Sequence, residues 1–294
     1  YSDNGSTAVE VALKMAIQFW HNQGQIKKKF IALEGAYHGD TFGSMSVGAR
    51  GGFNTPFEPF LFEVEFIDLP TSDNFDRVIQ KFHSLVAAGE IAGFIYEPLI
   101  QGSAGMRMYD PEHLEALLKM AKEHHVLCIA DEVFTGFGRT GKNFASEYCH
   151  TFPDIICLSK GLTGGYLPLG ATACNETIYN AFSSKDLHKT FLHGHSYTAN
   201  PLACAAGAES LRILLTEECK SSRNSISQTF QSWQSAFSDF PMVENVRGLG
   251  CIFALDVKNA TDTSYFNPVR EKLYKLFLQK NILLRPLGNV IYVV

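Results

Sequence analysis

Short apolar runs alternate with segments of helical periodicity over the first part of the chain. Apolar residues recur at intervals of three and four in some segments, which predicts helices over residues 8–20, 75–88 and 111–125. The runs between these segments are apolar at nearly every position, which predicts buried strands over residues 30–33, 91–96, 126–130 and 154–158. Strands without a polar face, separated by helices, are typical of a parallel sheet that helices cover on both sides. The sequence therefore predicts an α/β fold.

The pattern changes after Asn200. We expect a helix over residues 201–216, a second one to about residue 237, a strand over 251–257, a helix over 269–279 and a final segment over 282–294. This order indicates a second, smaller α+β unit. We therefore expect a large domain of residues 1–215 and a small domain of residues 216–294.

Composition and charge exclude several functional classes. The 294 residues include 25 Lys and Arg against 30 Asp and Glu, a net charge of −5 without a basic stripe, so we expect no nucleic-acid partner. No apolar run reaches the roughly 18 residues that a membrane helix needs. The seven cysteines are scattered without a Cys-x-x-Cys spacing, as is typical of proteins in the reducing cytoplasm. Because Tyr1 stands in a loop that leads into a helix, we expect an N-terminal segment to precede it in the complete protein.

Three polar features stand where an open α/β sheet binds ligands, beyond the carboxyl ends of its strands. Asp131 directly follows one predicted strand, and Lys160 follows the next strand, 29 residues later. Gly5 and Ser6 begin the first helix, whose free N–H groups and dipole favour an anion such as phosphate. A pyridoxal 5'-phosphate (PLP) enzyme needs an amine for the aldehyde carbon, a carboxylate for the ring nitrogen and a phosphate cradle. Taken singly, however, each feature is also explained as a helix cap, an ion-pair partner or a solvated lysine.

Longer sequence blocks around these residues decide between the two interpretations. They comprise residues 4–10, 37–39, 130–133, 136–141, 159–165, 193–196 and 200–203. In this order they resemble the signature of the class III, or ω-type, aminotransferases, which are PLP enzymes of fold type I. The resemblance implies a three-layer α/β/α large domain, a smaller α+β domain and a homodimer with composite active sites.

The resemblance also implies which residues hold the cofactor ring. Lys160 carries PLP and moves the proton during catalysis, and Asp131 pairs with the ring nitrogen. Val133 packs on one face of the ring, and Tyr37 lies over the other. Lys160 is thus the expected catalytic residue.

The phosphate and substrate contacts follow from the same resemblance. Gly5 and Ser6 hold the phosphate, helped by His195 and Ser196 reaching across from the other subunit. Ser196 stands where the family usually has threonine, and the hydroxyl group is retained. Gly194 and Tyr37 line the substrate pocket. The His193–His195 pair has no third ligand at a suitable spacing, so we expect no metal site.

Within the family, residues 37–43, 101–109 and 284–288 resemble the members that act in biotin biosynthesis. Those members transfer an amino group to 8-amino-7-oxononanoate and form 7,8-diaminononanoate, with S-adenosylmethionine as the donor. The resemblance assigns Arg285 to the carboxylate of the oxononanoate, for which a guanidinium fork is the geometric match.

Other functions remain open at this point. An ornithine, GABA or lysine aminotransferase has the same cofactor residues, and a related PLP decarboxylase or aminomutase has the same fold. A non-enzymatic nucleotide-binding module is the third alternative. Arg139 either guides a substrate carboxylate or forms an ion pair with nearby Glu132.

Overall fold

The computed structural model describes residues 1–258 and 267–294, and its main feature is a six-stranded sheet. The strand order is β2 (Val64–Ile67), β1 (Lys29–Leu33), β3 (Ile91–Tyr96), β6 (Leu127–Asp131), β7 (Ile155–Leu158) and β8 (Ala171–Cys174). The first five strands run parallel, and β8 pairs antiparallel with β7 at the edge. The four predicted strands are thus parallel, as expected, and β8, which the sequence did not predict, adds an antiparallel edge strand.

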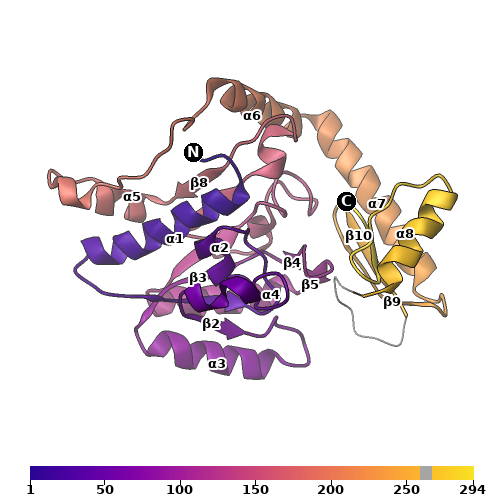
Figure 1. The fold of residues 1–294 in the computed structure, drawn as a ribbon, viewed down its shortest axis with the longest axis horizontal. Coiled ribbons are helices and arrows are strands. Elements are labelled where there is room, and N and C mark those ends of the chain that lie inside the picture. Colours follow the sequence, from indigo (N-terminus) through magenta and orange to yellow (C-terminus); the bar gives the residue numbers. More distant parts are fainter. Residues whose placement is uncertain (259–266) are drawn as a thin grey trace.

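Helices cover the sheet on both faces, as predicted (Figure 1). On one face α1 (Gly5–Asn22) packs with α5 (Glu176–Phe182), and on the other lie α3 (Phe75–Ala87) and α4 (Pro111–Glu123). Alternate residues of β1 serve the two cores, because Phe30 faces α1 whereas Ile31 belongs to the α3–α4 side. Burial on both sides explains why these strands are apolar at every position.

Shorter elements connect these layers. They are α2 (Phe42–Ser46), the β4–β5 pair (Ile100–Gln101 and Arg107–Met108) and four 3-10 helices, η1 (Thr55–Phe60), η2 (Ala145–Tyr148), η3 (Lys160–Thr163) and η4 (Leu187–Lys189). The predicted helix after Asn200 is α6 (Pro201–Leu214), with the Asn200 side chain as its cap. Within the described ranges, no helix is long and apolar enough to span a bilayer.

A second, three-stranded antiparallel sheet has the order β11 (Val290–Val293), β10 (Ile252–Val257) and β9 (Val243–Leu249). It lies with α7 (Glu217–Phe237) and α8 (Val269–Gln279) at the right of Figure 1. Phe230 of α7 packs on Phe253 on one face of this sheet, whereas Ile252 and Val290 join the core of the first sheet. Most of the final predicted segment, residues 282–294, is loop, and only its end forms a strand.

Glu115 of α4 ties the loop after η2 to the helix layer, and its contacts give a testable prediction. Its carboxylate accepts the N–H of His150, the N–H of Thr151 and the Thr151 hydroxyl. Burial opposes ionisation, but these hydrogen bonds and Lys119 outweigh it and lower the pKa of Glu115 from 4.5 to about 2. A carboxyl with a lowered pKa stabilises the fold above pH 4.5 and ceases to do so as the pH falls towards 2.

We expect Glu115→Gln to lower the free energy of unfolding at pH 7 by about 1–2 kcal/mol, because solvent screens part of the effect of the lowered pKa and the glutamine oxygen still accepts a hydrogen bond. The difference from the wild type should shrink steadily between pH 4.5 and pH 2. Urea unfolding of both proteins across this range measures it. A difference that does not change with pH would contradict the assigned hydrogen bonds.

Candidate active site

Asp131 and Lys160 lie at the same edge of the first sheet. Asp131 is the last residue of β6, and β6 pairs in parallel with β7, with Asp131 opposite Cys157. Lys160 follows β7 after Ser159 and opens η3, with a φ of +44° that L-residues rarely adopt. Because the carboxyl ends of parallel strands meet at one edge, the amine and the carboxylate converge there, as the sequence predicts.

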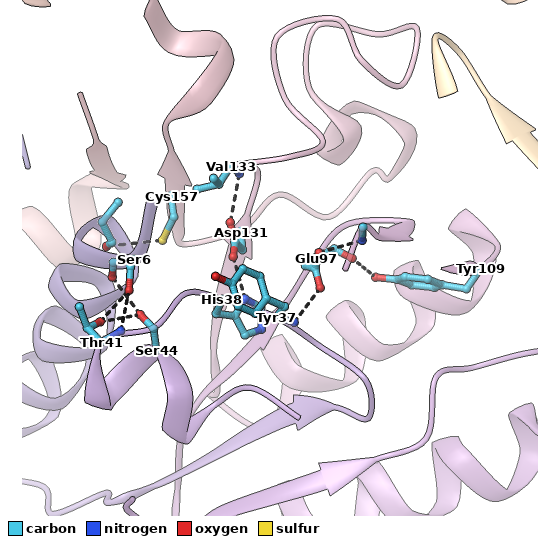
Figure 2. Close-up of polar contacts among 12 residues, drawn as sticks. Ser6, Tyr37, His38, Thr41, Ser44, Glu97, Tyr109, Asp131, Val133 and Cys157 are labelled. Carbon is cyan, nitrogen blue, oxygen red and sulfur yellow. Dashed lines mark hydrogen bonds and ion pairs between the residues drawn. The ribbon is translucent and has the colours of Figure 1, made fainter. Parts of the chain in front are cut away.

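Asp131 is buried and held by two hydrogen bonds (Figure 2). Its Oδ2 lies 2.7 Å from Nδ1 of buried His38, and its Oδ1 accepts the N–H of Val133 at 3.0 Å. Both bonds satisfy the carboxylate oxygens in a buried position, where an unpaired polar group would be costly. The sequence analysis missed His38, although its place after a buried strand was a usable signal.

Lys160 is surrounded by groups that act on its pKa. Partial burial lowers the pKa of Lys160, the negative charges of Asp131 and Glu97 oppose this, and the positive charge of Arg139 lowers it further. Its Nζ lies over the ring of Phe134, 5.4 Å from the centroid. The net shift increases the fraction of neutral amine, which is the nucleophilic form.

The first turn of α1 approaches the same edge. Gly5 packs so closely on Val133 that a Cβ at Gly5 would lie 2.7 Å from Cγ1 of Val133. The side chain of Asn4, the N-cap of α1, accepts a hydrogen bond from the Thr7 N–H. No described residue accepts a hydrogen bond from the N–H of Gly5 or Ser6. These two N–H groups are therefore available to an anion at the helix N-terminus.

Ser6 and Tyr37 are fixed by residues that the sequence analysis did not single out. The Ser6 hydroxyl contacts the Thr41 hydroxyl at 2.8 Å and accepts the Thr41 N–H at 3.0 Å. The Tyr37 hydroxyl donates to Asp40 at 2.9 Å, and burial followed by this bond raises the pKa of Tyr37 to about 12. The Tyr37 phenol therefore keeps its proton at neutral pH.

Comparison with known proteins agrees with this arrangement. The family model for class III aminotransferases matches residues 1–294. The chain belongs to this family. It is 46% identical to the adenosylmethionine-8-amino-7-oxononanoate aminotransferase of Synechococcus elongatus, over 99% of this chain and 70% of the relative. The protein of that name from Staphylococcus aureus is 38% identical, over 99% of this chain and 68% of the relative.

Solved structures place this class III aminotransferase in the same fold. An adenosylmethionine-8-amino-7-oxononanoate aminotransferase from Methanocaldococcus jannaschii superposes with a TM-score of 0.90 at 36% identity, covering 100% of this chain and 69% of that one. An amine transaminase from an uncultivated Pseudomonas species, solved in its PLP-bound form, gives 0.90 at 31% identity, covering 99% and 70%. The predicted fold class and family are confirmed.

The predicted partner-subunit residues of this aminotransferase lie on the loop before α6. Gly194 and Ser196 are exposed, and His195 Nδ1 lies 3.6 Å from Asp3, just before α1. No hydrogen bond or ion pair among the described residues joins this loop to Asp131 or Lys160. In the described part of the chain, no three His, Cys, Asp or Glu side chains gather as a metal site requires.

Arg285 and Arg139 belong to different parts of the aminotransferase. Arg285 is exposed on the loop before β11. The Arg139 guanidinium lies over Phe134, 4.9 Å from the ring centroid. An ion pair with Glu132 is the wrong alternative, because the Glu132 carboxylate instead accepts hydrogen bonds from Thr135, Ala145 and Ser146.

The contact between Gly5 and Val133 yields a second prediction. Gly5→Ala should lower the free energy of unfolding by about 1–3 kcal/mol, because the added methyl group meets Val133 Cγ1 at 2.7 Å. Adding Val133→Ala should recover most of this loss, with Val133→Ala alone as the control. Urea unfolding of the four proteins without PLP measures the coupling. Strictly additive losses would show that the two residues do not press on each other.

Proposed function

We propose that this chain binds PLP and transfers an amino group from S-adenosylmethionine to 8-amino-7-oxononanoate, forming 7,8-diaminononanoate for biotin biosynthesis. One observation carries the proposal. Lys160, whose pKa is lowered, and Asp131, which is held by two hydrogen bonds, lie at the same edge of the sheet. The substrate assignment is supported by relatives of that name at 46% and 38% identity. These relatives favour this reaction over the ornithine, GABA, lysine, decarboxylase and aminomutase alternatives.

The residues present fit PLP. The Lys160 amine suits the aldehyde carbon, and the Asp131 carboxylate suits a protonated ring nitrogen. The unpaired N–H groups of Gly5 and Ser6 suit the phosphate, in a cradle that a side chain at Gly5 would close against Val133. Tyr37 is the proposed contact for the second ring face. When bound, PLP supplies an electron sink for the negative charge that develops on the substrate carbon.

The protein's own groups then have defined tasks. With PLP bound, the Lys160 Nζ would take the proton from the substrate carbon that bears the amino group and deliver it to the former aldehyde carbon of the cofactor. The lowered pKa of Lys160 keeps its amine available as a base. The Asp131 carboxylate, fixed by His38, would hold a proton on the ring nitrogen of bound PLP. The Tyr37 hydroxyl, with a pKa of about 12, serves as a neutral hydrogen-bonding group towards the substrate.

We also propose that the active sites are composite in a homodimer. His195 and Ser196 would complete the partner's phosphate site, and Gly194 would line its substrate pocket. Leu192 and Tyr197 on this loop are 83% and 70% exposed, which supports a surface that a second subunit covers. We further propose that the large domain ends at residue 215 and that the small domain begins at residue 216. We also propose a cytoplasmic location, which the seven free cysteines support.

The test is an assay of one amino donor at a time. The protein is supplied with PLP and 8-amino-7-oxononanoate, and 7,8-diaminononanoate is measured by mass spectrometry. We expect S-adenosylmethionine to give product and Lys160→Ala to give none while its circular dichroism spectrum stays unchanged. Product from Lys160→Ala would refute the catalytic assignment. Release of carbon dioxide, or turnover without a donor, would instead indicate a decarboxylase or an aminomutase.

Arg285 gives a prediction about selectivity. Removing a charged hydrogen bond to the oxononanoate carboxylate should cost about 1.5–3 kcal/mol, so Arg285→Ala should lower kcat/KM for that substrate by roughly 10–150-fold. Single-turnover measurements of the donor half-reaction should change far less. Arg285→Lys, which keeps the charge but not the fork, is the control. Equal losses in both half-reactions would contradict the assignment.

A further inference from the structure

Glu97 is a buried carboxylate at the same sheet edge that the reaction described above does not use. It directly follows β3, the neighbour of β6, and is only 4% exposed. Its Oε1 accepts the N–H of Tyr37 at 3.0 Å, and its Oε2 accepts the N–H of Gly102 at 3.1 Å (Figure 2). Its main-chain oxygen accepts the Tyr109 hydroxyl at 2.7 Å, which anchors the turn from the other side.

Each of the two segments that Glu97 joins supports a different part of the site. One carries Tyr37, whose hydroxyl is directed to Asp40. The other carries Gly102, where a Cβ would lie only 3.1 Å from the Phe134 ring. Phe134 in turn lies beneath the Lys160 amine, 5.4 Å from Nζ to the ring centroid. A single carboxylate therefore connects the tyrosine segment with the ring that supports the lysine.

We propose that Glu97 is a positioning residue of the reaction, which fixes Tyr37 and the Gly102–Phe134 contact through its two hydrogen bonds to backbone N–H groups. The inference rests on the proposed function for its kinetic part alone. A glutamine has the same shape but presents an NH₂ group to one of the two N–H donors. Replacement by glutamine therefore removes one of the two bonds without opening a cavity.

Several titratable groups act together with Glu97. They are His38 after β1, Asp131 on β6, Lys160 on η3, and Tyr37 and Tyr109 on the two joined segments. Burial raises the pKa of Glu97 to about 7. The negative charge of Asp131 also raises this pKa, whereas His38 and the two N–H donors lower it. Protonation places a hydroxyl group opposite one N–H donor and weakens that bond. The two segments should therefore respond to pH together.

The direct test is NMR of the PLP-free protein between pH 5.5 and 8.5. We expect the amide signals of Tyr37 and Gly102 to shift together with one midpoint near pH 7 in the wild type, and Glu97→Gln to abolish this shared midpoint. In the transamination assay, Glu97→Gln should lower kcat at least tenfold, leave KM for the donor within about threefold and remove the corresponding limb of the pH profile.

Glu115→Gln is the matched control, because Glu115 also accepts two backbone N–H groups but lies on α4, away from these segments. It should alter neither the Tyr37 and Gly102 signals nor the pH profile. Glu97→Asp keeps an ionisable group and should retain a pH midpoint with a smaller loss of kcat. If Glu97→Gln does not fold, the proposal is tested by the amide titration of the wild type and by the pH midpoint and kcat of Glu97→Asp.

Two results would overturn the proposal: Tyr37 and Gly102 amides that do not titrate together in the wild type, or Glu97→Gln kinetics equal to those of Glu115→Gln. Failure of the proposed function is a distinct outcome. In that case no donor yields 7,8-diaminononanoate with the wild type, while the PLP-free amide titration still tests Glu97 alone.

Discussion

The parallel pairing of β6 with β3 and β7 is the constraint on which the rest of the site depends. Parallel strands end at one edge, so the residues that follow β3, β6 and β7 must come together there. Those residues are Glu97, Asp131 and, one residue further on, Lys160. An amine and two carboxylates that lie far apart in the sequence thus share one neighbourhood, where the two carboxylates oppose the lowering of the Lys160 pKa by burial.

Buried charge is the cost of this arrangement, and local hydrogen bonds offset it. Asp131 is held by His38 and the Val133 N–H, and Glu97 by two backbone N–H groups. Glu132, the next residue after Asp131, is satisfied by the loop around η2. Each of these carboxylates therefore has its hydrogen-bond donors in place.

The second sheet is tied to the first through the Gly-rich block that carries Arg139. The N–H of Cys251 donates to the Arg139 main-chain oxygen at 2.9 Å. Arg247, which pairs with Asp256, donates its Nε–H to the Met106 main-chain oxygen at 2.8 Å. The loop before β11 that carries Arg285 therefore belongs to a sheet in direct contact with the blocks around Lys160.

The sequence by itself determined the alternation of elements, the two-sided cover of the sheet, and the positions of Asp131, Lys160 and Gly5 at element ends, because apolar periodicity and caps are local signals. It did not reveal β2, which carries Glu65, or β8, whose small residues pair antiparallel. Only the tertiary structure decided that His38 and Glu97 join the site and that Arg139 does not pair with Glu132. Those contacts span up to 93 residues and depend on burial, which no local pattern records.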